Sequence, residues 1–130
     1  MVGIVLISHS SGLADGAAEL VSQVAAGVRV VAAGGTEDGR LGTSTQLILD
    51  AIGKADQGAG VLLIPDLGSS VLSARAVVAD LDHDGGGPRV VLADAPFVEG
   101  AVAAGVAASI GADLAAVARM AEEARDARKF

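Results

Sequence analysis

Four short runs of apolar residues stand out in the hydrophobic pattern of the chain. They contain almost no polar positions, whereas a strand with one face in water alternates apolar and polar residues. Near-continuous runs of Val, Ile and Leu are typical of parallel strands covered on both faces. The pattern therefore predicts buried strands at residues 2–8, 28–33, 60–65 and 89–93.

The Ala-rich stretches between and after these runs predict helices. They cover residues 13–26, 44–54, 69–81, 97–109 and 113–129. Asp113 is the expected N-cap of the last helix. The apolar positions of that helix fall near one face, with most of its charges opposite: Leu114, Val117, Ala121, Ala124 and Phe130.

This alternation of strands and helices predicts an α/β fold with a doubly wound, mostly parallel sheet and helices on both faces. Right-handed crossovers and the common doubly wound arrangements predict the strand order 2-1-3-4, with the first strand central. The segment DHDGGGP, residues 82–88, predicts a surface loop. We expect residues 1–130 to form a single domain.

Charge and composition narrow the classes of function. Lys and Arg total 9 against 16 Asp and Glu, a net charge of −7, which argues against nucleic acid and anionic membranes as partners. With two Phe and no Trp or Tyr, the chain also lacks platforms for stacking bases. The absence of Cys excludes disulfide frameworks, thiolate metal sites and cysteine nucleophiles. No membrane span or basic leader segment is recognisable, so we expect a cytoplasmic location.

Candidate chemistry gathers where the first and third strands end. Ligands of open α/β sheets bind beyond the carboxyl ends of the strands, where the strand order switches. In the order 2-1-3-4 this point lies between His9, after the first strand, and Asp66, after the third. An imidazole can act as a nucleophile near neutral pH, and a carboxylate on one ring nitrogen leaves the other free to attack. His9 is therefore the candidate nucleophile, with Asp66 orienting it.

Small polar residues flank this pair. Hydroxyls and backbone N–H groups at helix N-termini commonly hold phosphoryl groups, which points to a phosphoryl site without a metal or cofactor. Further N–H donors are expected from residues 34–36 and 42–44. The candidate phosphoryl-binding residues are Ser10, Ser11, Gly35, Gly68, Ser69 and Ser70.

Simpler interpretations stay open for the same residues. A lone His at a strand end is commonly an ordinary polar residue, and Ser-Ser-Gly after it is also ordinary helix-capping sequence. His83 is expected in the solvated loop, Arg75 as a surface charge or a partner contact, and Glu99 in the first turn of a helix.

Other functions of this fold fit less well. HSSGLADG does not match the glycine pattern of dinucleotide enzymes, and a phospho-aspartate receiver domain would need an acidic pair after the first strand. A pure binding module remains an alternative, although it leaves the pairing of His9 with Asp66 unexplained.

Four segments carry a family resemblance: GIVLISHSSGLADG, AAGGTEDGRLGTS, LLIPDLGSSVLSAR and APFVEGAVAAGVAASIGADL. Together they resemble the IIA domain of the phosphotransferase-system subunit of dihydroxyacetone kinase, in the mannose-type IIA superfamily. The resemblance covers nearly the whole chain, and PDLGSS with APFVEG is its most specific part.

The resemblance implies a homodimeric phosphohistidine carrier. Its donor would be the phosphocarrier protein HPr, and its acceptor ADP bound on the nucleotide-binding subunit of dihydroxyacetone kinase. The family's phosphorylated histidine falls on His9, with Nε2 the implied phosphorylated atom, and its hydrogen-bonding aspartate falls on Asp66. A sugar-transporter or regulatory IIA domain is the alternative function.

Overall fold

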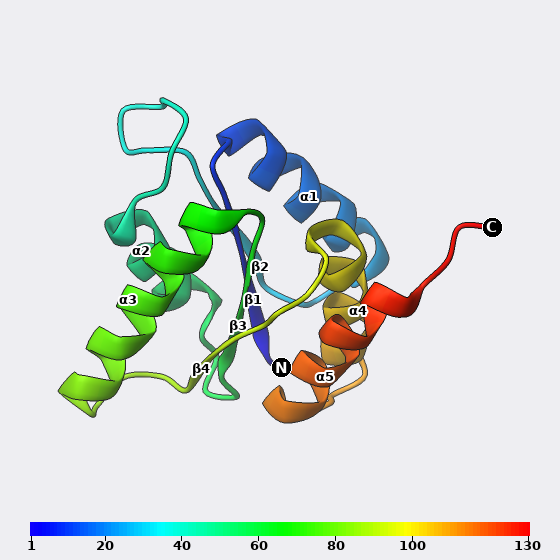
Figure 1. Cartoon of the computed structure of the whole chain (residues 1–130). Helices are drawn as coiled ribbons and strands as arrows, with labels where there is room; N and C mark the ends of the chain where they lie inside the picture. The colour runs from blue at the N-terminus through cyan, green and yellow to red at the C-terminus, as the bar shows by residue number, and fades with distance from the viewer.

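The computed structural model describes residues 1–130, and its elements alternate as the hydrophobic pattern predicts (Figure 1). The strands are β1 Gly3–Ser8, β2 Val30–Gly34, β3 Val61–Pro65 and β4 Val90–Leu92. The helices are α1 Ser11–Val24, α2 Thr45–Ala55, α3 Gly68–Asp84, α4 Phe97–Ser109 and α5 Leu114–Glu123, followed by the short 3-10 helix η1 Ala124–Asp126.

The four strands form one parallel sheet in the order β2-β1-β3-β4, which confirms the predicted topology. β1 is central and pairs in parallel with β2 on one side and β3 on the other. In that register Ser8 lies opposite Gly34, and Ile7 lies opposite Pro65. The carboxyl ends of β2, β1 and β3 therefore lie side by side at one end of the sheet.

Successive residues of β1 face opposite sides of the sheet, and each side has its own core. Ile4 and Leu6 belong to a cluster that α1, α4 and α5 cover. Val5 and Ile7 belong to a second cluster that α2 and α3 cover. All four side chains are fully buried. Figure 1 shows these two helical layers on either side of the sheet, which explains why the strands read as continuous apolar runs.

Side-chain caps begin three of the helices. The hydroxyl of Ser10 accepts the backbone N–H of Leu13 in α1, and the hydroxyl of Ser44 plays the same part for α2. Asp113 accepts the N–H of Ala116 in α5, which confirms it as the predicted N-cap. Each cap satisfies an N–H group that the first turn of a helix leaves without a partner.

The predicted loop at residues 82–88 begins too early. α3 continues through Asp84, so His83 lies exposed in its last turn rather than in the loop. The helix ends where Gly85 adopts the left-handed conformation (φ 73°) and donates its N–H to the carbonyl of Leu81. Residues 82–84 contain no helix breaker, so the first glycine sets the boundary.

The last predicted helix is shorter than its pattern suggested. α5 is followed by η1, and residues 127–130 form neither helix nor strand. Phe130 is fully exposed rather than part of the buried face, while Leu114 and Val117 are buried as expected. Arg125 forms an ion pair with Asp94 (Nη2–Oδ2 3.3 Å). No helix of the structure has the length and apolar character needed to cross a bilayer.

Candidate phosphoryl-transfer site

His9 and Asp66 meet because β1 and β3 are adjacent and parallel. The N–H of Asp66 donates to the carbonyl of Ile7 at 2.9 Å, which extends the ladder one residue beyond β3. The Nδ1 atom of His9 lies 2.9 Å from Oδ1 of Asp66. These residues are 57 positions apart in sequence, and the sheet alone brings them together at the predicted switch point.

Both oxygens of the Asp66 carboxylate accept hydrogen bonds. Its Oδ2 atom accepts from the Ser8 hydroxyl at 2.8 Å and from the His9 N–H at 3.1 Å. Besides His9 Nδ1, its Oδ1 atom contacts the Leu67 N–H at 2.7 Å and the Ser70 hydroxyl at 2.9 Å. The side chain is only 7% exposed. Asp66 is thus held in one orientation.

These contacts set the ionisation of Asp66. Burial alone raises the pKa of a carboxyl group, but hydrogen bonds from Ser8, Leu67, Ser70 and the His9 backbone outweigh it and lower the pKa of Asp66 to about 2. The group is therefore an anion near neutral pH, able to accept hydrogen bonds and unable to donate one.

An acceptor on one side of the ring decides the tautomer of His9. Because the Asp66 anion has no proton to give, Nδ1 must carry the ring proton, and in the neutral ring Nε2 keeps its lone pair. Nε2 lies 2.5 Å from the hydroxyl oxygen of Ser69, which can donate to it. The His9 side chain is 29% exposed, so this nitrogen lies on the accessible side of the pair.

Two helix N-termini flank His9. No hydrogen bond is formed by the backbone N–H groups of Ser11 and Gly12 in α1, nor by those of Gly68 and Ser69 in α3. The hydroxyl of Ser10 accepts a hydrogen bond as the α1 cap, and its proton stays free. Free N–H groups at helix N-termini are suitable hydrogen-bond donors for an anionic group.

Other predicted phosphoryl-binding residues have different roles. Ser70 is buried, and its hydroxyl donates to Asp66 and to the carbonyl of Leu67. The N–H of Gly35 donates to the carbonyl of Ser8, while Gly42 donates to the carbonyl of His9. Their donors make hydrogen bonds within the protein in this structure, and their binding of a phosphoryl group stays a prediction.

Ser8 contacts the site but was not among the candidate residues predicted from the sequence. It is the last residue of β1, is fully buried and contacts Asp66 directly. One signal was present in the sequence: a hydroxyl residue ends an otherwise apolar strand immediately before the candidate histidine. A buried hydroxyl needs a polar partner, and the end of the neighbouring strand supplies one.

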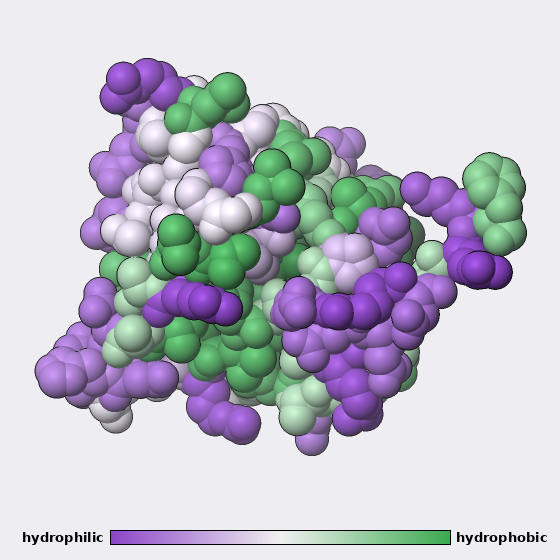
Figure 2. Space-filling model, viewed as in Figure 1, coloured by the Kyte–Doolittle hydropathy of each residue, from purple (hydrophilic) through white to green (hydrophobic).

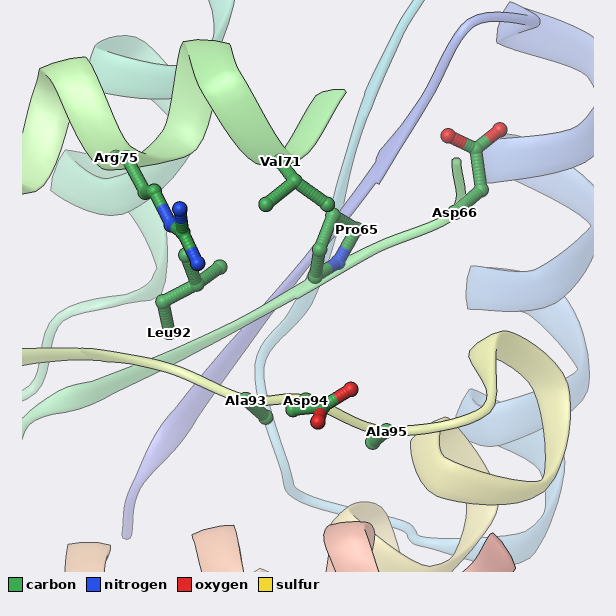
Figure 3. Close-up of a pocket in the computed structure, with 8 residues that line it drawn as sticks. All are labelled: Pro65, Asp66, Val71, Arg75, Leu92, Ala93, Asp94 and Ala95. Atoms are coloured by element: carbon green, nitrogen blue, oxygen red, sulfur yellow. The ribbon is translucent and has the colours of Figure 1, made fainter. Parts of the chain in front are cut away.

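A cavity of about 340 Å³ adjoins the site between the ends of β3 and β4 (Figure 3). Asp66 lies at one end of it, and Pro65, Val71 and Leu92 form apolar walls. Arg75 also lines the cavity and forms no ion pair. This placement agrees with the expectation of an exposed Arg75 and puts it beside the site.

Comparisons with known proteins agree with this geometry. Residues 3–118 match the family model for the PTS system fructose IIA component. The chain is 38% identical over 107 residues to the phosphoryl donor subunit DhaM of a PEP-dependent dihydroxyacetone kinase 2 of Listeria innocua, covering 82% of this chain and 85% of the relative. It is 31% identical to the phosphotransferase subunit DhaM of a PTS-dependent dihydroxyacetone kinase of Lactococcus lactis, covering 93% and 94%.

Longer relatives and a solved structure give the same picture. A DhaM of Providencia stuartii is 34% identical over 99% of this chain, which spans 28% of that protein. The crystal structure of EF1359, a protein of unknown function, superposes with a TM-score of 0.84 at 34% identity, covering 99% of this chain and 98% of the other. These matches show that the chain, with its histidine directly after β1, belongs to the phosphotransferase-system IIA family and is a IIA domain of the DhaM type.

Proposed function

We propose that this protein is a phosphohistidine carrier. His9 accepts a phosphoryl group from phospho-HPr and passes it to ADP on the nucleotide-binding subunit of a dihydroxyacetone kinase. The relatives named as phosphoryl donor subunits of such kinases support the acceptor class. A cytoplasmic location belongs to this proposal. In this role the chain carries the group, and the kinase subunits act on the substrate.

The observation that carries the proposal is the pairing of His9 with Asp66. A nucleophilic nitrogen needs a free lone pair directed toward its partner, and the 2.9 Å contact at Nδ1 leaves that lone pair on Nε2. An ordinary polar histidine at a strand end would not require a buried anion with four further hydrogen-bond donors around it.

Each of the two transfer steps forms one bond to phosphorus and breaks another. The Nε2 lone pair attacks phosphorus in line, and the nitrogen–phosphorus bond of the donor histidine breaks with its electron pair returning to the donor. In the second step a terminal phosphate oxygen of ADP attacks phosphorus, and the electron pair of the broken bond returns to Nε2. Nδ1 keeps its proton throughout, and the Asp66 anion balances the positive charge that the ring acquires.

The phosphoryl oxygens would be held by the two helix N-termini. Backbone N–H groups of Ser11, Gly12, Gly68 and Ser69 are free for this task, as are the hydroxyls of Ser10 and Ser69. Ser69 must move its proton from Nε2 to a phosphoryl oxygen when the nitrogen becomes bonded to phosphorus. Fixed donors of this kind stabilise charge without reorganising during the reaction.

The surface around the site suits protein partners. Leu41 is 81% exposed, and Leu67 and Leu72 at the start of α3 are similarly open. Figure 2 shows a small apolar area at one end of the largely polar loop that precedes α2, and further apolar areas over the first turns of α3. Exposed apolar residues beside a reacting group favour a site that partner proteins cover. A homodimer is also proposed, on the family resemblance alone, and sedimentation equilibrium would test it.

Intact mass spectrometry tests the function. The chain is incubated with phosphoenolpyruvate, enzyme I and HPr, and an ADP-loaded kinase subunit is added afterwards. We expect a gain of one acid-labile phosphoryl group, its loss when the subunit is added, and no gain for His9→Gln. A gain that persists would instead favour a transporter or regulatory IIA domain. No gain with active HPr, or a full gain in His9→Gln, would refute the carrier assignment.

A further inference from the structure

The hydroxyl of Ser8 makes hydrogen bonds to two parts of the site. It donates to Oδ2 of Asp66 at 2.8 Å and accepts the backbone N–H of Ser10 at 3.0 Å. Ser8 is fully buried, so no water replaces either partner. One side chain thereby joins the carboxylate that orients the His9 ring to the residue that caps α1.

We propose that Ser8 is a positioning residue for phosphoryl transfer. It holds the Asp66 carboxylate and the N-terminus of α1 in fixed positions around His9. The inference rests on the proposed function, because these relative positions affect the reaction only if His9 carries a phosphoryl group. Ser8 itself touches neither the ring nitrogens nor the open side of the site.

The first half of the role follows from the unequal surroundings of the two carboxylate oxygens. Oδ1 has donors from His9, Leu67 and Ser70, whereas Oδ2 has only the Ser8 hydroxyl and the His9 N–H. Without Ser8, Oδ2 keeps a single donor in a buried position, which is unfavourable for an anion. The carboxylate is then held less firmly on its Oδ2 side, and the contact that keeps the proton on Nδ1 weakens.

The second half concerns the other end of the hydroxyl. Ser10 is the N-cap of α1, and the next two N–H groups of the helix are free donors beside His9. If Ser8 lacked its oxygen, the Ser10 N–H would lose its partner, and the chain would shift to find another. Such a shift moves the proposed phosphoryl-binding groups relative to Nε2, and small displacements of positioned groups are costly in rate.

Ser8→Cys and Ser8→Ala test the proposal. Cys fills nearly the same space as Ser but is a weak hydrogen-bond donor, so this variant separates the effect of the hydrogen bond from the effect of side-chain packing. Ala removes the donor entirely. Circular dichroism and thermal unfolding establish that each variant is folded. Ser22→Ala, on the exposed surface of α1, is the matched control.

Two measurements are made on each variant. Nitrogen-15 NMR of the His9 imidazole reports which nitrogen carries the proton, and it needs no phosphorylation partner. The rate of phosphoryl gain from phospho-HPr reports the reaction. We expect a reduced fraction of the Nδ1-protonated tautomer and a rate lowered about tenfold or more in both Ser8 variants, with Ser22→Ala unchanged.

The outcomes separate this proposal from the assignment of function. Wild-type tautomer and rate in folded Ser8→Cys and Ser8→Ala would overturn the role of Ser8. A slower rate with an unchanged tautomer would overturn the link from Ser8 to Asp66, because Asp66 would then be held without Ser8, and would support only the link to the N-terminus of α1. Failure of the wild-type chain to gain a phosphoryl group would refute the carrier function, while the tautomer measurement would still report on Ser8.

Discussion

The Nδ1 atom of His9 lies 2.9 Å from Oδ1 of Asp66, a side chain that is only 7% exposed. The carboxylate accepts four other hydrogen bonds, which hold it in place and keep it ionised. A mobile surface carboxylate would populate several orientations and define the ring tautomer poorly. The rigidity of Asp66 therefore connects the fold to the proposed chemistry at Nε2.

Replacing Asp66 by Asn should slow phosphoryl gain by roughly ten- to a hundredfold while leaving the fold intact. The amide oxygen can still accept from Nδ1, but the negative charge that balances the ring is lost. The measurement is the rate of phosphoryl gain by intact mass, with Asp80→Asn on the exposed part of α3 as control. A wild-type rate for Asp66→Asn would remove Asp66 from the mechanism.

The same carboxylate should make stability depend on pH. The pKa of Asp66 is lowered from 3.8 to about 2 in the folded protein, so the ionised form stabilises the fold above about pH 4. This stabilisation, about 2 kcal/mol, is lost as the pH falls from 4 through 2. Urea denaturation between pH 7 and 2 should show the advantage of wild type over Asp66→Asn shrinking in that window. A constant difference across the window would contradict this account of Asp66.

Replacing Ser69 by Ala should lower the rate of phosphoryl transfer severalfold without affecting stability. Its hydroxyl lies 2.5 Å from Nε2, so the variant loses a donor placed where phosphoryl oxygens would arrive. The residue is exposed, which predicts a change below about 0.5 kcal/mol in the free energy of unfolding. Single-turnover transfer and urea denaturation check both statements, and a marked loss of stability would indicate a structural role instead.

Gly34→Ala should destabilise the protein by about 1–3 kcal/mol, because β2 passes very close to the start of α1. A Cβ atom at Gly34 would lie 2.6 Å from the backbone oxygen of Ser10 and 2.7 Å from the Cβ atom of Ala14. Gly16→Ala is the control, since nothing lies within 4 Å of its added atom. That change should stabilise α1 by about 0.5–1 kcal/mol. Equal unfolding free energies for the two variants would contradict the close approach at Gly34.

Much of the fold was predictable because buried parallel strands have a recognisable sequence pattern. Each strand is an apolar run, and the order β2-β1-β3-β4 follows from general rules of handedness and winding. His9 and Asp66 could be paired from sequence for the same reason, since both follow strands whose carboxyl ends must be neighbours. Boundaries were less certain, as the extension of α3 to Asp84 shows.

The sequence by itself determined which segments become strands and helices and which polar residues arrive at the switch point, because both depend on local patterns and on topology. Only the tertiary structure decided what each polar group does there. The Ser69 hydroxyl contacts His9, and the Ser70 hydroxyl donates to Asp66. The Ser8 hydroxyl contacts both Asp66 and the N-cap of α1, although all three residues are serines at the ends of elements. A hydroxyl takes whichever partner its surroundings place within about 3 Å, and those partners come from segments far apart in the chain.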